Sequence, residues 1–208
     1  MIRIRLAAGR SPLPVADLTP GEARQEAALP GERRRRHWRT ARRALRTVLA
    51  GTGLHPDTSR HAFPHRLLSL SYAGPLAVAA AVVGGDAAAV AGTGVDIELG
   101  DPPPPQTARF FLGEHEHRHL LAAGAAERPK ALLRYWTVKE ALFKADPANA
   151  GTDLRRYLVD RPGQWRGAAR LAGDARPRFR YASFDVPPGF LSVACMLSPN
   201  GVAENARE

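Results

Sequence analysis

The sequence predicts an α+β fold, because stretches of helical spacing and stretches typical of β-strands occupy separate parts of the chain. Two helical stretches are each followed by several short apolar runs, with glycine or proline between the runs. Four consecutive prolines, Pro102–Pro105, separate the two sets, because such a run is extended and cannot continue a strand ladder. We therefore expect two α+β halves, at residues 1–100 and 101–198, and a polar, mobile tail at residues 199–208.

The N-terminal half begins with an amphipathic helix. Apolar side chains recur at three- and four-residue spacing from Trp38 to Leu49, with arginines between them, and Gly51 supplies a stop signal. A loop rich in histidine and proline follows at residues 54–66. The next three apolar runs are expected to form an antiparallel meander: Leu67–Tyr72, Leu76–Val83 and Val90–Leu99.

The C-terminal half repeats this order loosely, without a convincing residue-level repeat. Helical spacing surrounds Phe110–Leu121, and a second helix is expected over Leu132–Ala145. Four strand-like runs follow: Leu154–Val159, Gln164–Leu171, Phe179–Asp185 and Phe190–Leu197. The last two are joined by Pro-Pro-Gly at residues 187–189, which is a strong turn signal.

Composition excludes several classes of protein. The 208 residues are 44% hydrophobic and 24% charged, which is the balance of a globular protein and rules out a disordered or collagen-like chain. Cys195 is the only cysteine, so no intrachain disulfide forms, and its apolar strand pattern predicts a buried, inert thiol. The longest apolar run, Leu76–Val83, is far shorter than the ~20 residues of a membrane span. We expect a cytoplasmic protein.

The net charge of +10 comes from 30 Lys and Arg against 20 Asp and Glu. Such a charge favours acidic partners. Only Lys130, Lys139 and Lys144 are lysines, and all other cations are arginines. This bias indicates a compositional preference, so charge alone does not identify a partner.

The first motif with chemical content is Gly-Val-Asp-Ile-Glu at Gly94–Glu98. Residues at i and i+2 of a strand share one face, so Asp96 and Glu98 point the same way. Two carboxylates this close repel each other unless a cation lies between them, and a hard cation such as Mg²⁺ prefers oxygen ligands. The alternative interpretation is the outward polar face of an edge strand.

The second motif is Trp-Thr-Val-Lys-Glu-Ala-Leu-Phe-Lys at Trp136–Lys144. Glu140 and Lys144 lie at i and i+4 on one helix face, and the alternative interpretation is an ordinary surface ion pair. However, two of the three lysines fall inside this motif, where arginine would serve a surface pair equally well. Lysine is a compact point charge and can donate a proton, which favours a specific task.

Three further clusters carry less information alone. Arginines gather at Arg33–Arg36 and continue along the first helix, where they suit phosphate recognition or a solvated helix face. Ser69–Gly74 is a strand entering a tight turn, whose hydroxyls are candidates for phosphate contacts. His115 and His119 are spaced to hold zinc or to lie on a solvated face, and no other motif supplies further ligands.

Together these residues resemble the 4′-phosphopantetheinyl transferase superfamily, surfactin-synthetase-activating type. The family signatures Gly-Val/Ile-Asp-Ile-Glu and Trp-Ser/Thr-x-Lys-Glu-Ala/Ser-x-x-Lys stand at Gly94–Glu98 and Trp136–Lys144. Weaker likeness covers most of residues 33–199, and includes Arg109–Phe111, Trp38–Thr40, Phe184–Phe190 and Ser192–Cys195. The paired signatures are specific, whereas either one alone would not be.

The resemblance implies a fold and an activity. The fold would be an intramolecular pseudo-dimer of two similar halves, each a helix packed on a small antiparallel sheet, with the active site between them. The enzyme would transfer 4′-phosphopantetheine from coenzyme A to a serine of an acyl or peptidyl carrier protein. The pathways served would be secondary metabolism, of polyketides or nonribosomal peptides, or fatty-acid-type synthesis.

The resemblance also assigns roles by matching position. Asp96, Glu98 and Glu140 would be Mg²⁺ ligands, and Glu140 would accept the proton of the carrier serine. Lys144 would neutralise the pyrophosphate, and Lys139 would support the site electrostatically. The residues implied in coenzyme A binding are Arg36, Arg39, Thr40, Ser71 and Tyr72, with Arg33 as a further candidate.

Two departures from the family pattern fall on coenzyme A binding. The family usually has Ser-His where this chain has Ser71-Tyr72, and Tyr72 carries no positive charge at neutral pH. The family's Gly-Lys/Arg-Pro is absent from residues 54–61, and Arg60, His61 and His65 are the candidates to replace it.

The expected partners are coenzyme A and an acidic carrier protein, which the positive charge would steer to a monomeric enzyme. We expect neither nucleic acid nor membrane as a partner. Two alternatives remain open. One is a repurposed homologue with an altered ligand or reaction. The other is a non-catalytic module that binds carrier proteins or nucleic acid through its +10 charge, which leaves the acidic motifs unexplained.

Overall fold

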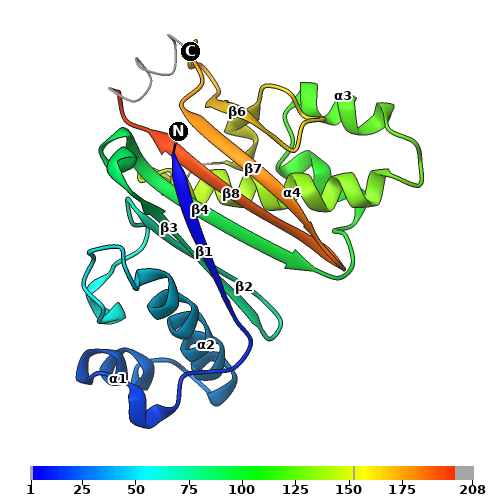
Figure 1. The fold of residues 1–208 in the computed structure, drawn as a ribbon. Coiled ribbons are helices and arrows are strands. Elements are labelled where there is room, and N and C mark those ends of the chain that lie inside the picture. Colours follow the sequence, from blue (N-terminus) through cyan, green and yellow to red (C-terminus); the bar gives the residue numbers. More distant parts are fainter. Residues whose placement is uncertain (1, 152, 200–208) are drawn as a thin grey trace.

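The computed structural model describes residues 2–151 and 153–199 and confirms a mixed α+β fold (Figure 1). Most of the tail expected at residues 199–208 lies outside the described residues. The helices are α1 (Pro20–Ala27), α2 (Glu32–Leu49), α3 (Glu114–Ala122) and α4 (Arg128–Ala145). The strands are β1 (Arg3–Gly9), β2 (Leu68–Ala73), β3 (Leu76–Val83), β4 (Val90–Leu99), β5 (Tyr157–Val159), β6 (Arg166–Leu171), β7 (Phe179–Val186) and β8 (Gly189–Leu197).

The strands form two sheets in which every pairing is antiparallel. The smaller sheet has the order β1-β3-β2, and the larger has the order β4-β8-β7-β6-β5. Figure 1 shows α2 beside the smaller sheet and α4 along the larger one. Each sheet therefore has its own long helix, as the fold class expected from the sequence has. None of the described helices is long and apolar enough to cross a bilayer.

The smaller sheet is covered by the helix predicted around Trp38–Leu49. Leu45 and Val48 of α2 are fully buried, and they pack with Leu68 of β2 and the alanines of β3. Trp38 is only half-buried and lies under the Arg42 guanidinium, 4.8 Å from its ring centroid. The apolar stripe therefore faces the sheet, and the aromatic residue at its end shields a cation.

One strand assignment within the N-terminal half was wrong. We expected Val90–Leu99 to be the third strand of a meander with β2 and β3, but β4 pairs with β8, from Val90 opposite Leu197 to Leu99 opposite Gly189. The place beside β3 is instead taken by β1, which the sequence analysis did not predict. Because β4 belongs to the larger sheet, its acidic residues lie against α4 of the C-terminal half.

The two sheets meet through one apolar cluster. It joins Val78 and Ala80 of β3, Val95 and Ile97 of β4, and Leu191 and Val193 of β8. The free edge of β4 is closed by side chains of β2, because the Ser69 hydroxyl accepts the Val95 N–H at 2.9 Å and the Ser71 hydroxyl accepts the Ile97 N–H at 3.3 Å. Two serines thus satisfy backbone groups that a neighbouring strand would otherwise pair.

Candidate functional site

The candidate site lies where α4 passes closest to β4. The face of β4 opposite the apolar cluster carries Gly92, Gly94, Asp96 and Glu98 in alternation. A Cβ on Gly94 would lie 1.8 Å from the Ala141 carbonyl oxygen of α4, so only glycine permits this approach. The glycines of β4 allow α4 to pack directly against the strand. Asp96 and Glu98 follow on the same face of β4.

Asp96 is the centre of the site and is buried between β2 and α4. Its Oδ1 atom accepts hydrogen bonds from the Ser71 hydroxyl at 2.8 Å and the Lys144 ammonium at 2.6 Å. The Ser71 hydroxyl also accepts from Lys144 at 3.2 Å, so these three side chains form a closed set. The Asp96 Oδ2 atom is buried and has no partner in the described part of the chain.

Glu98 and Glu140 complete the acidic group. Trp136, one turn before Glu140 on α4, donates its indole N–H to Glu98 Oε1 at 3.0 Å. Burial raises the pKa of Glu98, and the Asp96 charge adds to the shift, whereas the Trp136 hydrogen bond and the Lys144 charge oppose it. The site therefore holds Glu98 in a fixed orientation beside another carboxylate.

The pKa of Glu140 is raised above its ordinary value, with burial as the main cause. The Lys144 charge opposes the shift, and the charges of Asp96 and Glu98 add to it. The Lys144–Asp96 ion pair and the Trp136–Glu98 hydrogen bond place this part of α4 against the acidic residues of β4. Asp96, Glu98, Glu140 and Lys144 therefore form one electrostatic group. Two sequence segments predicted separately thus form one site.

Lys139 lies outside this group, although it is adjacent to Glu140 in sequence. Its side chain is fully buried, donates to Glu116 Oε2 of α3 at 2.6 Å and also bonds the Tyr157 carbonyl. Glu116 in turn accepts the Val159 N–H at 2.8 Å. Burial lowers the pKa of Lys139, and the Glu116 carboxylate opposes that shift. The pair fixes α4 to α3 and β5 and therefore positions the helix.

The residues implied in coenzyme A binding are distributed along α2 and β2. Arg36 is exposed, and Thr40 is buried with its hydroxyl donated to the Arg36 carbonyl at 2.9 Å. Arg39 is held in ion pairs with Glu26 at 3.3 Å and Glu32 at 2.5 Å. Of this set, the structure brings only Ser71 into contact with the acidic group.

Tyr72 connects β2 to α2. Its side chain is 59% exposed, and its ring centroid lies 5.4 Å from that of His37, a residue that the sequence analysis did not single out. Tyr72 alternates with Ser71 along β2, so its side chain points toward α2 and away from Asp96. His37 thus contacts Tyr72 on the α2 side of the smaller sheet.

The loop at residues 54–66 contributes to a cavity of about 350 Å³ that reaches Lys144. Phe63 and Pro64 line one side of this cavity, and Ser69 and Lys144 line another. Of the candidates to replace the absent Gly-Lys/Arg-Pro, Arg60 is exposed, whereas His61 is buried with Nε2 2.8 Å from the His55 carbonyl oxygen. His61 is therefore committed to its own loop.

Trp136 is the functional residue whose role sequence reasoning missed. It was part of the second motif, but no role was assigned to its indole. Its spacing of four residues from Glu140 places both on one helix face, and this spacing was the available signal. His37 offered no comparable signal, because its proximity to Tyr72 depends on how α2 crosses the sheet.

Two other sequence features take no part in the site. His119 Nδ1 lies 2.8 Å from the Tyr135 hydroxyl oxygen, and this contact links α3 to α4. Cys195 is buried as predicted, and burial raises the pKa of its thiol to about 12. A thiol of this kind is inert at neutral pH.

Comparison with protein families finds one similarity, and it covers both acidic motifs. Residues 92–190 match the model of the 4′-phosphopantetheinyl transferase superfamily. No curated protein sequence matches the chain. The matched segment runs from β4 to β8 and contains Asp96, Glu98, Glu140 and Lys144, and it leaves out α1, α2 and β1–β3. This segment is therefore similar to the phosphopantetheinyl transferases in the part of the chain that carries the acidic motifs.

Proposed function

We propose that the protein is a Mg²⁺-dependent 4′-phosphopantetheinyl transferase of the surfactin-synthetase-activating type. The substrates are coenzyme A and the serine hydroxyl of an acyl or peptidyl carrier protein. The observation that carries the proposal is the electrostatic group of Asp96, Glu98, Glu140 and Lys144 within the matched segment. Its single buried cysteine suits the cytoplasm, and its two joined halves suit a monomer.

The donor atoms of the site fit Mg²⁺. No three or more His, Cys, Asp or Glu side chains in the described residues form a ready metal cage. Mg²⁺ bound with phosphates needs only one or two carboxylates and keeps several waters, so a full cage is not required. We propose Asp96 and Glu98 as the ligands, because Asp96 Oδ2 is buried and has no hydrogen-bond partner among the described residues. Glu140 lies in the same electrostatic group, beside these two carboxylates. Bound there, Mg²⁺ would neutralise charge on the pyrophosphate of coenzyme A.

In the proposed reaction, Glu140 and Lys144 have different roles. The serine oxygen forms a bond to the phosphorus that bears pantetheine, and the bond from that phosphorus to the bridging oxygen breaks. Glu140 accepts the serine proton, for which burial and its raised pKa suit it. The electron pair of the broken bond leaves with adenosine 3′,5′-bisphosphate, whose new charge Lys144 neutralises.

The N-terminal half supplies the coenzyme A contacts in this proposal. Arg36 is exposed on α2, and its neighbour His37 contacts the Tyr72 ring of β2. The cavity beside Lys144 adds space on the other side of Ser69. Because Arg39 is held by Glu26 and Glu32, we expect it to organise α2 and to bind phosphate only after exchanging those partners.

The test is intact-protein mass spectrometry of several apo-carrier proteins incubated with the full chain, coenzyme A and Mg²⁺. Transfer adds ~340 Da to the carrier, the mass of the group added. Chelation of Mg²⁺ should abolish the gain, and a carrier with the acceptor serine changed to alanine is the matched control. If coenzyme A binds but no carrier gains mass, the second candidate function is favoured, namely a homologue with an altered reaction. The presence of Tyr72 where the family usually has histidine supports this second candidate.

A further inference from the structure

The outer face of β6 and β7 carries a cluster of arginine and aromatic side chains. Phe179 and Tyr181 of β7 pack toward α4 in the core of the larger half. The alternate residues Arg180, Ala182 and Phe184 therefore point to the opposite face. Their cross-strand neighbours on β6 share that face, with Arg166 opposite Ala182 and Ala168 opposite Arg180.

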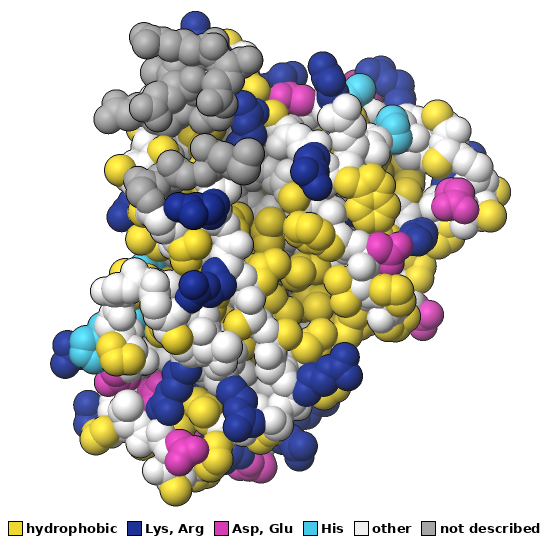
Figure 2. All heavy atoms as spheres, in the orientation of Figure 1, with side chains coloured by type: hydrophobic (Ala, Val, Ile, Leu, Met, Phe, Trp, Pro, Cys, Tyr) yellow, Lys and Arg dark blue, Asp and Glu magenta, His cyan; other side chains and the backbone are white. Residues whose placement is uncertain are grey.

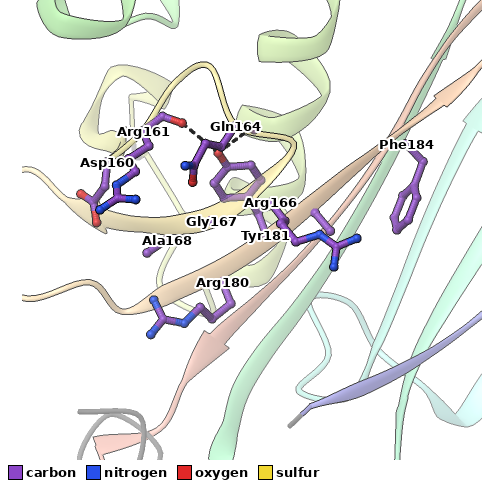
Figure 3. Close-up of a pocket in the computed structure, with 10 residues that line it drawn as sticks. Asp160, Arg161, Gln164, Arg166, Gly167, Ala168, Arg180, Tyr181 and Phe184 are labelled. Atoms are coloured by element: carbon purple, nitrogen blue, oxygen red, sulfur yellow. Dashed lines mark hydrogen bonds between the residues drawn. The ribbon is translucent and has the colours of Figure 1, made fainter. Parts of the chain in front are cut away.

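This outer face is open. A pocket of about 700 Å³ lies over it, and Figure 3 shows Arg166, Arg180 and Phe184 around this pocket. Both arginines are exposed, and Phe184 is 42% exposed. The Tyr181 hydroxyl donates to the Gln164 carbonyl at 3.1 Å, which ties the loop beside the pocket to β7. The pocket is therefore built on a sheet and an anchored loop.

The charges of the pocket are unbalanced. Arg161, Arg166 and Arg180 line it and make no ion pair with another described residue. The acidic side chain in the lining, Asp160, is paired with Arg170 at 2.8 Å. Three guanidinium groups thus face a pocket whose carboxylate is already neutralised, which favours an anionic partner.

An apolar floor continues from the arginines toward β1. Ala182 and Val186 pack against the cluster that joins the two sheets, and Ile4 of β1 reaches the same cluster. Leu6 follows Ile4 on the same face of β1 and is 38% exposed. Figure 2 shows hydrophobic side chains gathered in a hollow in the middle of this face. The surface therefore combines an apolar groove with an arginine rim.

We propose that this groove binds an amphipathic helix of an acidic partner protein. The apolar stripe of such a helix would lie on Phe184 and Leu6, and its flanking carboxylates would meet Arg166 and Arg180. Single-stranded nucleic acid needs several aromatic platforms, and Phe184 is the one exposed aromatic ring of the lining. A second copy of this chain would bring a net charge of +10 against the arginine rim.

The groove is independent of the proposed transferase chemistry. Asp96 and Glu98 point toward α4, on the opposite face of the larger sheet from Arg180 and Phe184. A helix bound in the groove would leave the acidic site open. The inference therefore predicts a docking partner that binds whether or not coenzyme A is present.

The test measures fluorescence anisotropy of two labelled synthetic helical peptides with the same leucine stripe, flanked in one by glutamate and in the other by lysine. The full chain should bind the acidic peptide at least tenfold more tightly than the basic one. Arg166→Glu combined with Arg180→Glu should weaken acidic-peptide binding at least tenfold. The matched control changes Arg24 and Arg34, exposed on α1 and α2, to glutamate and should weaken it less than threefold.

A second variant separates apolar contact from charge. Phe184→Ser should weaken both peptides equally, because the leucine stripe is common to them. The proposal is overturned if the two double variants weaken binding equally, or if Phe184→Ser has no effect on either peptide. It is also overturned if labelled oligo-dT binds the groove more tightly than the acidic peptide. Self-association of the chain that the groove variants abolish would assign the groove to a second copy instead.

Discussion

At the residue scale, the two carboxylate oxygens of Asp96 differ in their hydrogen bonding. Asp96 Oδ1 accepts from both Ser71 and Lys144, while Oδ2 is buried and has no partner among the described residues. A buried acceptor without a donor costs free energy unless a ligand or cation completes it. This buried oxygen is therefore the reason for proposing a cation at Asp96.

Glu140→Gln tests the assignment of proton acceptor. The amide keeps the size of the side chain but cannot accept the serine proton, so transfer should fall by at least ~100-fold. Circular dichroism should remain unchanged, because the Glu140 side chain makes no hydrogen bond to another described residue and the helix backbone is unaltered. The rate is measured by intact-mass analysis of a carrier protein. A variant with near-normal turnover would remove Glu140 from the mechanism.

Tyr72→His tests the first departure from the family pattern. A histidine there adds a donor that can carry charge, so coenzyme A should bind about tenfold more tightly, or ~1.4 kcal/mol. Isothermal titration calorimetry at pH 6 and pH 8 measures the change, with the gain larger at the lower pH. Unchanged affinity, together with a loss in His37→Ala, would show that His37 already fills this role.

Residue types and spacing predicted the two pairs within the acidic group, and the family resemblance joined the pairs into one site. Alternation on a strand placed Asp96 with Glu98, and helical spacing placed Glu140 with Lys144. The destination of Lys139 was not predictable, because its partner Glu116 lies on another helix, and the contact requires the packing of α3 against α4. Local sequence patterns predict which residues share a face of a helix or strand, but they do not predict which distant residues contact that face.

At the scale of elements, the contact of α4 with β4 decides the geometry of the site. Gly94→Ala would place a Cβ 1.8 Å from the Ala141 carbonyl oxygen, so the helix must move. We expect a loss of stability of about 1–3 kcal/mol in urea unfolding, and a fall in transferase rate larger than this loss explains. Gly124→Ala is the control, because its Cβ meets nothing within 4 Å. Unchanged activity in Gly94→Ala would show that α4 is not positioned through this contact.

Glu22 links α1 to α2 and to the loop that follows. It is buried, and its carboxylate accepts from Arg46 at 3.3 Å, from the Thr58 hydroxyl at 2.5 Å and from the Thr19 N–H at 2.9 Å. Burial raises its pKa, but these hydrogen bonds and the Arg46 charge outweigh burial and hold the pKa below the ordinary 4.5. Glu22 therefore stabilises the fold above pH 4.5, and this stability is lost as pH falls through the lowered pKa.

Glu22→Gln should remove this pH dependence. The variant should be less stable than the parent at pH 7, and the difference should shrink between about pH 5 and pH 3. Thermal unfolding across this range measures it, with Glu114→Gln as the control, since Glu114 forms an exposed pair with Arg118. A constant difference at every pH would mean that Glu22 contributes by packing alone.

Helix α1, strand β1 and the pairing of β4 were not predicted, and the sequence indicates these three features to different degrees. Helix α1 begins with a capping box, in which Thr19 and Glu22 each bond the other's backbone N–H, and this pattern of Thr-x-x-Glu is readable from sequence. Strand β1 was indicated only by the short alternation in Arg3-Ile4-Arg5. The pairing of β4 with β8 was not readable, because both candidate neighbours of β4 are equally apolar.

At the scale of the whole molecule, β4 serves both halves. It is an edge strand of the larger sheet, and its other edge is closed by Ser69 and Ser71 of the smaller sheet. Its apolar face, through Val95 and Ile97, belongs to the cluster between the sheets. The acidic site therefore exists only when both halves are folded and joined.

Ile97→Ala tests this cooperativity. Ile97 is 2% exposed, and its truncation should cost about 2–5 kcal/mol by leaving a cavity between the sheets. Because the cluster joins both halves, we expect one unfolding transition in which far-ultraviolet dichroism and tryptophan fluorescence coincide. Trp38 reports on the smaller half, and Trp136 on the larger.

Single-tryptophan variants that keep only Trp38 or only Trp136 separate these signals, and Ile97→Ala is then compared in both. Leu121→Ala is the control, since Leu121 is 51% exposed and its truncation should change stability by less than about 0.5 kcal/mol. If Ile97→Ala lowers the midpoint reported by Trp136 but not that reported by Trp38, the halves unfold independently. Equal shifts of both midpoints would show that β4 couples the acidic site to the folding of the entire chain.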